Sequence, residues 1–562
     1  MPKNIVLCSD GTGNSGGELR GTNVWRVFRA VDLNGHKWER GVWQQIAFHD
    51  DGVGTQDNIL VKALSAAFGF GLKRNIAQLY TFLANNYEPG DQVFLFGFSR
   101  GAYTVRALAG LIASCGVVDG RRYDDRELRS LVKKAIRILR SRFRSWPMKQ
   151  ILALPWVARR LKGSAERAHR FRRFHAVQDE RHAPGGRVQI RFVGVWDTVD
   201  AYGFPFDHLG DFVHHCIYPF RFPDRCLSKQ VLKASHAISI DDERHTFHPV
   251  LWNEQDEDGT RINQVWFPGA HSNVGGGYAK DGMAFVTLDW MMAEAERDLG
   301  HDKPGLRFLS VQRQTAADAA NAHDKLYNSR AGLAAYYRYK PRDVGAIARE
   351  HGIEKPSIHV STFHRIRARS EGYAPGNLPA NLQIVATNGE INAKGEAPED
   401  LARLTRLIPA QKPRDASLLD EVSPYVRLRR YCHYLLVGLT ATLLIGAGII
   451  DKHFAGTQSD SNLLNKAAGV AGAIVPYAGE HLFNYLVKPF VAYPSILVAL
   501  LTSLLVAWSM GKLARGRMQD YFAGFWRRTV VLGKAAVDGS QLKLYRRAVT
   551  DAITQPFRSG SA

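Results

Sequence analysis

A serine flanked by glycines at the junction of two structural patterns restricts the fold of this chain more than any other feature. The apolar run Val93–Phe96 leads into Gly97-Phe98-Ser99-Arg100-Gly101, and a helical pattern follows over 102–112. A strand that turns this sharply into a helix strains its serine, and glycine is favoured two positions away because larger side chains would collide. The hydroxyl then lies at a helix N-terminus, where the dipole favours developing negative charge. This context predicts a nucleophile elbow rather than a chance match in a loop.

The segments around this elbow alternate between strand-like and helix-like patterns. We expect strands at 5–8, 44–49, 93–96, 187–196 and 264–267, and helices at 23–31, 72–87, 231–240 and 288–299. Such alternation favours a mostly parallel sheet with helices on both faces, in an α/β-hydrolase-like domain that spans residues 1–370. The mixed, polar residues 371–425 are expected to form a linker or an appended region.

Two residues further along the chain fit the partners that a nucleophilic serine requires. The serine needs a base, commonly histidine, which a carboxylate orients, and α/β-hydrolases supply them in the order Ser, Asp or Glu, His. Asp197 follows the strand-like segment 187–196, and His271 follows 264–267 in a glycine-rich turn. We therefore expect a triad of Ser99, Asp197 and His271. Asp241 and Asp242 also precede His271 after an apolar run, so they remain alternatives for the acid.

A polar, glycine-rich turn over residues 10–17 follows the first expected strand. A turn of this kind can present backbone N–H groups to an anion. It is not a Walker loop, because no Gly-Lys-Ser/Thr follows. We expect the backbone N–H groups of Arg100, Gly11 and Thr12 to form an oxyanion hole. The alternative is a tight loop without a chemical role.

The charge balance indicates an anionic partner. Lys and Arg number 74 against 53 Asp and Glu, which gives a net charge of +21 over 562 residues. A membrane surface, a nucleic acid or an acidic substrate would fit this charge, but the sequence contains no recognisable nucleic-acid-binding module. The five cysteines are scattered without metal-ligand spacing, which favours a reducing compartment and predicts neither disulfides nor a metal site. The apolar run near residue 5 has strand length, unlike a signal peptide.

Residues 121–180 form a basic insertion. Arg and Lys crowd 121–173, and apolar residues recur there at helical spacing: Leu128, Val132, Ile136, Leu139, Trp146, Met148, Ile151, Leu152, Leu154, Trp156 and Val157. Basic residues beside Trp and Leu on helices are typical of segments that lie at a membrane interface. We expect a membrane-facing lid, and a solvated helical insertion is the alternative.

Two continuous apolar runs stand out in the C-terminal third, at about 432–450 and 493–511. Each approaches the roughly 20 residues that cross a bilayer, so we expect a transmembrane hairpin over 426–515. Basic residues flank the pair on its outer sides, and 516–562 is a basic tail. The positive-inside rule then places both termini and the catalytic domain in the cytoplasm, at a bacterial inner membrane. The connection at 466–476 is expected to lie along the opposite leaflet, or else to form a third short helix.

Four blocks together resemble a known family: Ile5–Asn14, Gly97–Ala102, Gly194–Val199 and Pro268–Tyr278. They are similar to the uncharacterised-domain family that includes the phospholipase effectors of bacterial type VI secretion, over about residues 3–370. The resemblance implies an α/β-hydrolase-like core with lipase or esterase chemistry, with Ser99 as nucleophile, His271 as base and Asp197 as orienting acid. The family often has Asp where this chain has Asn273, which removes any accessory acidic role there.

Together these patterns predict a membrane-anchored serine hydrolase that acts on a lipid or other ester, most simply a phospholipase- or lipase-like enzyme, at an anionic membrane surface and without a cofactor. Two alternatives stay open. A metal-dependent phosphohydrolase would use the carboxylates of Asp10, Asp50, Asp51 and Asp197 with His271. A non-catalytic membrane scaffold or sensor would retain the elbow only as a vestige.

Overall fold

The computed structural model describes residues 2–11, 21–50, 70–142, 155–181, 186–200, 225–257, 259–297, 304–379, 381–387, 418–454 and 494–535. The chain divides into two compact units. The first comprises residues 1–329, 341–418 and 523–562, and the second comprises 330–340 and 419–522. The first unit carries the sheet and the predicted triad.

An eight-stranded sheet forms the centre of the first unit, with the strand order β2-β1-β3-β4-β5-β6-β7-β8. All neighbouring strands pair in parallel. The prediction of a mostly parallel α/β sheet is therefore confirmed. The strands are β1 (Lys3–Ser9), β2 (Gln44–Asp50), β3 (Gln92–Phe98), β4 (Ile190–Trp196), β5 (Val231–Ser239), β6 (Ile262–Phe267), β7 (Ser357–His359) and β8 (Gln383–Val385).

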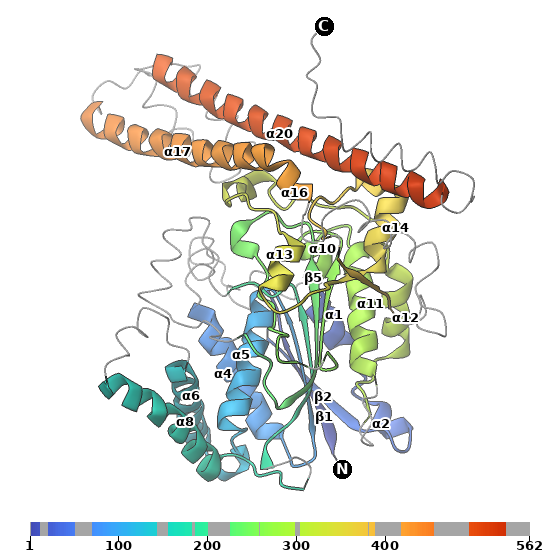
Figure 1. Ribbon diagram of the computed structural model, residues 1–562. Coiled ribbons are helices and arrows are strands. Elements are labelled where there is room, and N and C mark those ends of the chain that lie inside the picture. Colours follow the sequence, from blue (N-terminus) through green and yellow to red (C-terminus); the bar gives the residue numbers. More distant parts are fainter. Residues whose placement is uncertain are drawn as a thin grey trace, which may run out of the picture. The chain divides into compact units, whose positions relative to one another are not determined.

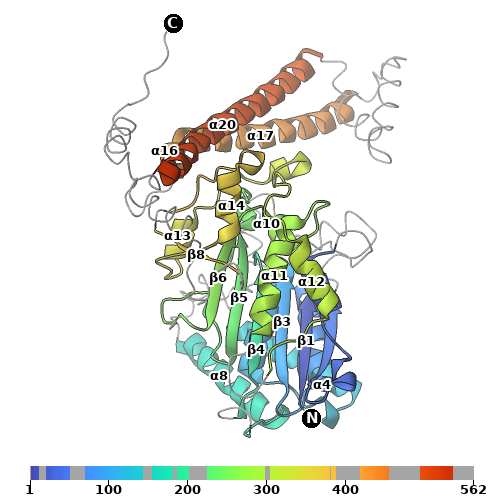
Figure 2. The ribbon, with the colours of Figure 1, turned by 90° about the vertical axis from the view of Figure 1, so that its right-hand side faces the viewer.

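Helices cover both faces of this sheet (Figure 1). One face carries α4 (Phe70–Asn86), α5 (Arg100–Cys115), α6 (Asp125–Arg142) and α8 (Pro155–His175). The other face carries α1 (Asn23–Ala30), α11 (Gly282–Glu296) and α12 (Ser310–Ala319), and Figure 2 shows α11 and α12 in front of the strands. The order reverses between β1 and β3, and open parallel sheets bind their ligands at such a switch point.

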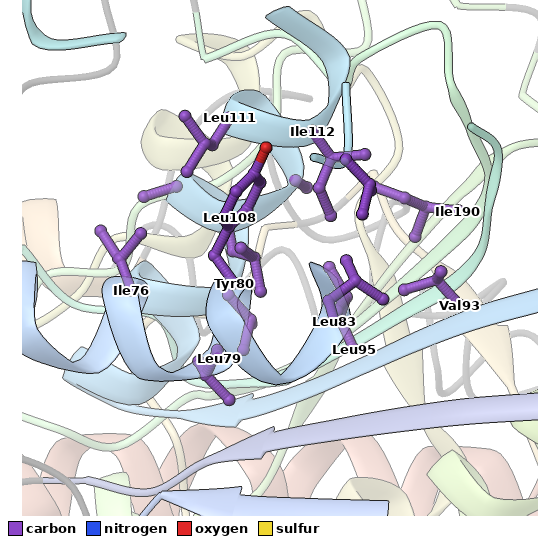
Figure 3. Packing of buried hydrophobic residues seen from close by; sticks show 14 of the residues in the cluster. Ile76, Leu79, Tyr80, Leu83, Val93, Leu95, Leu108, Leu111, Ile112 and Ile190 are labelled. Atoms are coloured by element: carbon purple, nitrogen blue, oxygen red, sulfur yellow. The ribbon is translucent and has the colours of Figure 1, made fainter. Parts of the chain in front are cut away.

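The core under α4 and α5 is built mainly from aliphatic side chains, with the aromatic ring of Tyr80 among them (Figure 3). Ile76, Leu79 and Leu83 of α4 and Leu108 of α5 pack there against strand residues that include Leu95. Successive residues of β1 divide between the two faces, with Ile5 and Leu7 in this core and Val6 and Cys8 in the core beneath α1 and α11. A strand covered on both faces is apolar at every position, which explains the continuous apolar runs in the sequence.

The helix that we expected at 231–240 is a wrong prediction, because these residues form β5. This strand lies between β4 and β6 and is buried along most of its length. Without a solvent-facing side it lacks the polar–apolar alternation of an exposed strand. A short buried strand and a buried helical segment then have the same hydrophobic pattern.

The expected linker or appended region at 371–425 contributes a strand to the sheet. Strands β7 and β8 extend the sheet beyond β6, so it continues past residue 370, where we expected the hydrolase-like domain to end. The remaining short elements are α2 (Gly35–Trp38), η1 (Gly120–Arg122), η3 (His245–Phe247), α10 (His271–Gly275), η4 (Gly332–Tyr336), α13 (Val344–Arg349), α14 (Val360–Ala368), η5 (Ser370–Gly372) and α16 (Leu418–Glu421).

The basic insertion forms α6 and α8, and both pack against the C-terminal half of α5. Cys115 Sγ contacts the carbonyl oxygen of Ala135, and Gly110 lies beside Leu139. At about 1.5 Å per residue, these contacts lie roughly 15 Å or more along α5 from its first residue. The described helices of the insertion therefore form an outer layer over α4 and α5 rather than a cover over the elbow serine. Residues 143–154, which the lid prediction also covered, lie outside the described residues.

Two long helices dominate the second unit, α17 (Ser423–Phe454) and α20 (Pro494–Ala535). Tyr336 of η4 forms a hydrogen bond with Thr440 of α17 at 3.0 Å. Among the described residues, one helix has the length and composition to cross a membrane, at 495–527, where an 18-residue window has a mean hydropathy of 1.9. It contains most of the predicted span 493–511, whereas the span predicted at 432–450 lies in α17. The hairpin as a whole stays a prediction, and 455–493 and 536–562 lie outside the described residues.

Candidate active site

Ser99 lies between the end of β3 and the start of α5 in a strained conformation. Its φ is 58° and its ψ is −121°, an arrangement that side-chain-bearing residues rarely adopt. The N–H of Ser99 donates to the carbonyl oxygen of Trp196 at the end of β4, at 3.0 Å. This bond fixes the turn to the neighbouring strand, so that the hydroxyl is held at the carboxyl edge of the sheet.

The two glycines of the motif are required by close backbone contacts. A Cβ on Gly97 would lie 2.6 Å from the carbonyl oxygen of Gly101, and a Cβ on Gly101 would lie 2.1 Å from the carbonyl oxygen of Ser9. Neither position has room for a methyl group, because the obstacles are backbone atoms. The elbow is therefore packed directly against the end of β1.

The structure brings the three predicted triad residues together. His271 Nε2 lies 2.8 Å from Ser99 Oγ, across 172 residues of sequence, and His271 Nδ1 lies 2.6 Å from Asp197 Oδ2. The side chains come from the carboxyl ends of β3 and β4 and from the first residue of α10, which follows β6. All three residues are buried, with Asp197 fully inaccessible. This is the geometry in which a histidine accepts a serine proton while a carboxylate holds its tautomer.

The Asp197 carboxylate accepts hydrogen bonds from three residues. Ser239 donates its backbone N–H to Oδ1 and its hydroxyl to Oδ2, at 2.9 and 3.2 Å. Arg342 spans both oxygens, with Nη1 2.7 Å from Oδ1 and Nη2 2.9 Å from Oδ2. Burial alone would raise the pKa of Asp197, but the Arg342 charge and the hydrogen bonds from His271 and Arg342 outweigh it and hold this pKa well below its usual range. Asp197 is therefore a carboxylate at neutral pH.

His271 is buried and contacts two aromatic rings. The ring centroid of Phe98 is 4.6 Å from that of His271, and the Phe247 ring approaches edge-on at 5.0 Å. Burial lowers the pKa of His271, and the hydrogen bond and charge of Asp197 oppose this shift without cancelling it. The imidazole is therefore neutral at physiological pH, which is the form that a general base requires.

The two alternative acids contact the backbone of the histidine loop instead of the imidazole. Asp241 Oδ2 accepts from the Gly269 N–H and from the Tyr373 hydroxyl. Asp242 Oδ2 accepts from the His271 N–H at 3.3 Å, and its carboxylate pairs with Arg244. Both acids thus hold the turn that carries the imidazole.

Asn273 has a similar role in the same loop. Its Oδ1 accepts from the N–H groups of Ala270 and Tyr327, and its Nδ2 donates to the carbonyl oxygen of Lys325. An amide supplies both the acceptor and the donor that this arrangement needs. The position at which the family often has Asp is thus a structural link in this chain.

The predicted oxyanion donors are only partly described. Arg100 is the first residue of α5, where backbone N–H groups precede the helical hydrogen-bond pattern. The Gly11 N–H donates to Oδ1 of Asp10 at 2.6 Å, so its use for an oxyanion requires that bond to open. Thr12 lies outside the described residues. The oxyanion hole stays a prediction.

The described members of the proposed metal cluster have other partners. Asp10 accepts from Gly11 and Thr22, and Asp50 Oδ2 accepts from the Ser9 hydroxyl. Within the described ranges, no group of three or more His, Cys, Asp or Glu side chains is arranged to hold a metal ion. Asp51 lies outside these ranges.

Sequence reasoning missed Arg342, Ser239 and Phe247. Arg342 follows a polar region without a periodic pattern, and Ser239 lies in the segment that we expected to be helical. Neither residue has a local signal that links it to Asp197. The role of Phe247 could not be predicted without the conformation of the turn after β5, because its ring contacts His271 only in the folded chain.

Comparisons with known proteins agree with this architecture. The model of the family described as T6SS phospholipase effector, Tle1-like, catalytic domain matches residues 3–294. An uncharacterized Saccharomyces cerevisiae protein, YEL023C, is 28% identical over 258 residues, which are 44% of this chain and 32% of that protein. The chain therefore spans about a third of that relative's length.

Two solved structures show weak likeness. An uncharacterized protein from Pseudomonas aeruginosa has 15% identity and a TM-score of 0.28, over 94% of this chain and 62% of the other. The Tle1 effector, bound to the VgrG spike of the type 6 secretion system, has 16% identity and a TM-score of 0.24, over 49% of this chain and 51% of the other. Neither TM-score is high enough to carry an argument.

Proposed function

The chain belongs to the family of T6SS Tle1-like phospholipase effector catalytic domains, and from this premise we propose that it is a membrane-anchored serine hydrolase that cleaves a carboxylic ester of a phospholipid or related lipid. The observation that carries the proposal is the chain of hydrogen bonds from Ser99 through His271 to Asp197. In this reading the core has an α/β-hydrolase-like fold, with the nucleophile on the turn after β3.

The reaction follows from the positions of the three side chains. Ser99 Oγ attacks the ester carbonyl carbon while His271 Nε2 takes the hydroxyl proton, and the imidazolium then protonates the departing alcohol. Water activated by the neutral His271 hydrolyses the acyl-enzyme and restores Ser99. Asp197 remains ionised throughout and keeps the His271 Nδ1 proton oriented. The Arg100 N–H and a donor from Gly11 or Thr12 would stabilise the oxyanion, by on the order of 3 kcal/mol per donor.

The C-terminal helices support membrane anchoring. Large apolar side chains on the first part of α20 are exposed, among them Val498, Leu501, Leu505 and Trp508, and those of α17 include Leu444 and Ile445. Lys512 lies over the Trp508 ring at 5.3 Å, and a Trp beside a Lys is typical of a span that ends at the headgroup level. We propose that both helices span a bacterial inner membrane, with both termini and the catalytic domain in the cytoplasm.

A lipid substrate fits this anchoring. A catalytic unit tethered to the bilayer is held near a high local concentration of lipid ester. The excess of basic residues would favour an anionic surface, at roughly 1 kcal/mol for each basic residue close to it. The helices of the basic insertion are candidates for this contact.

The decisive experiment is fluorophosphonate labelling of the full chain, purified in detergent, together with ester hydrolysis on a panel of phospholipids. We expect the wild type to be labelled and active, and Ser99→Ala and His271→Ala to lose both properties. Ser310→Ala, which changes an exposed serine on α12, is the matched control and should behave as wild type. Folded wild type that takes no label would support a scaffold or sensor instead.

The same assay separates the metal-dependent alternative. A serine mechanism should be indifferent to added chelator, whereas a metal-dependent phosphohydrolase would lose activity and recover it with a divalent cation. Alkaline carbonate extraction of membranes tests the anchor, because a chain with spanning helices stays in the pellet. Release of the full chain into the supernatant would contradict the proposed spans.

A further inference from the structure

Arg342 contacts the triad acid through both terminal nitrogens of its guanidinium. The residue is fully buried and lies 145 positions after Asp197 in the sequence. Nη1 donates to Asp197 Oδ1 and to the carbonyl oxygen of Ser239, and Nη2 donates to Asp197 Oδ2 and to the carbonyl oxygen of Phe247. The four protons on the two terminal nitrogens thus have four acceptors on three different segments.

These contacts hold the end of β5 and the end of η3 in addition to the Asp197 carboxylate. Ser239 ends β5, and Phe247 ends η3 and places its ring on His271. One planar guanidinium therefore links the acid, the strand next to it and an aromatic wall of the imidazole pocket. A lysine ammonium is a point charge with three protons and could not reproduce this planar fork.

We propose that Arg342 is a positioning residue of the triad, whose guanidinium holds the Asp197 carboxylate against His271 and shares the negative charge of that carboxylate. The inference rests on the proposed serine-hydrolase function and deepens it. In a triad without such a cation, the full carboxylate charge acts on the imidazolium. Here part of that charge is compensated by a fixed positive group, so His271 is protonated less readily.

The sign of the expected change follows from the charges around the site. The groups that face His271 are Asp197, Asp242 and Arg244, and Asp197 also faces His236, which burial keeps neutral with its pKa lowered to about 3. If Arg342 loses its charge, Asp197 acts on His271 undiminished, and the pKa of His271 rises. Because the reaction needs neutral His271, the acid limb of the pH profile moves to higher pH. An uncompensated neighbouring charge shifts a pKa by about one unit or more.

The test measures the rate of fluorophosphonate labelling at Ser99 and the kcat and KM of ester hydrolysis against pH, on the full chain. For Arg342→Met we expect the acid limb to move up by about one pH unit and kcat to fall about 10- to 100-fold, with little change in KM. Arg342→Lys keeps the charge but loses the fork, so its acid limb should stay at the wild-type pH while kcat still falls. Ser239→Ala removes a neutral donor from the same carboxylate, and it should not move the acid limb.

The outcomes separate the two proposals. If wild type is not labelled at Ser99, the proposed function fails and the role of Arg342 in it fails as well. If wild type is labelled but folded Arg342→Met retains the wild-type acid limb, only the role of Arg342 is overturned. Should Arg342→Met not fold, Arg342→Gln replaces it with the same expectation. If neither variant folds, Arg342→Lys supplies the test. A folded Arg342→Lys protein with the wild-type kcat would overturn the proposal that the planar guanidinium is required.

Discussion

Replacing Gly101 by alanine tests whether the elbow is packed as tightly as its backbone contacts indicate. The added Cβ would lie 2.1 Å from the carbonyl oxygen of Ser9 and 2.5 Å from that of Asp10. A comfortable separation for such atoms is about 3.5 Å, so the end of β1 or the start of α5 must move by more than about 1 Å. Both are backbone segments in the core, and neither can relax by changing a rotamer.

We therefore expect Gly101→Ala to lower the free energy of unfolding by about 3 kcal/mol or more, at the upper end of what overpacking costs. Gly110→Ala is the matched control, since it makes the same change on the same helix. The nearest atom to its added Cβ is Leu139 Cδ1 at 3.9 Å, an ordinary contact. This control should raise stability by about 0.5–1 kcal/mol, because alanine favours a helix over glycine.

Thermal and denaturant unfolding of both variants beside the wild type supplies the measurement, with Ser99 labelling as a second readout. The expected result is opposite signs for two Gly→Ala changes on one helix, with labelling lost only in Gly101→Ala. If Gly101→Ala were as stable as Gly110→Ala, the contact between the elbow and β1 would not be as close as described. The steric reason given for the second glycine of the motif would then be wrong.

Three further predictions concern the pH dependence and the histidine loop. Burial lowers the pKa of His271, so the acid limb of wild-type kcat/KM should have its midpoint below pH 6.5, and a midpoint above 6.5 would contradict this environment. Burial raises the pKa of Asp241 to about 6, so this group stabilises the fold at low pH and loses that effect as the pH rises through 6. Between pH 5 and pH 8, the free energy of unfolding should therefore fall by about 1.4 kcal/mol less in Asp241→Asn than in wild type, as measured by denaturant unfolding. Equal losses in the two proteins would argue against the raised pKa of Asp241. Asn273→Asp places a carboxylate oxygen against the Lys325 carbonyl oxygen and should cost about 1–3 kcal/mol, seen as a lower melting temperature, whereas unchanged melting would show that the amide donor is dispensable.

The sequence allowed much of the sheet and the candidate triad to be predicted, because both leave local signals. A buried parallel strand is a short apolar run, and the turn after β3 carries its glycines for steric reasons that apply wherever the chain bends this way. Ser99 and Asp197 each follow such a run directly, and His271 follows one after three residues. Their convergence at one edge of the sheet is therefore implied by parallel pairing.

What could not be predicted depends on contacts between distant segments. The choice among Asp197, Asp241 and Asp242 required the position of the imidazole relative to each carboxylate. Strands β7 and β8 have three residues each, too few for any period to be visible. Arg342 has no local pattern at all, since its four acceptors come from three segments that only the fold brings together.

The position of Arg342 also has a consequence for the timing of protein synthesis. A ribosome that adds roughly 5–20 residues per second needs about 4–14 s to travel from His271 to Arg342, which lies 71 codons later. During that interval the serine, the histidine and the acid have all been translated, while the guanidinium that braces them has not. An enzyme with the proposed function, assembled in this order, would have a reduced activity on the ribosome until the segment that carries Arg342 emerges and folds.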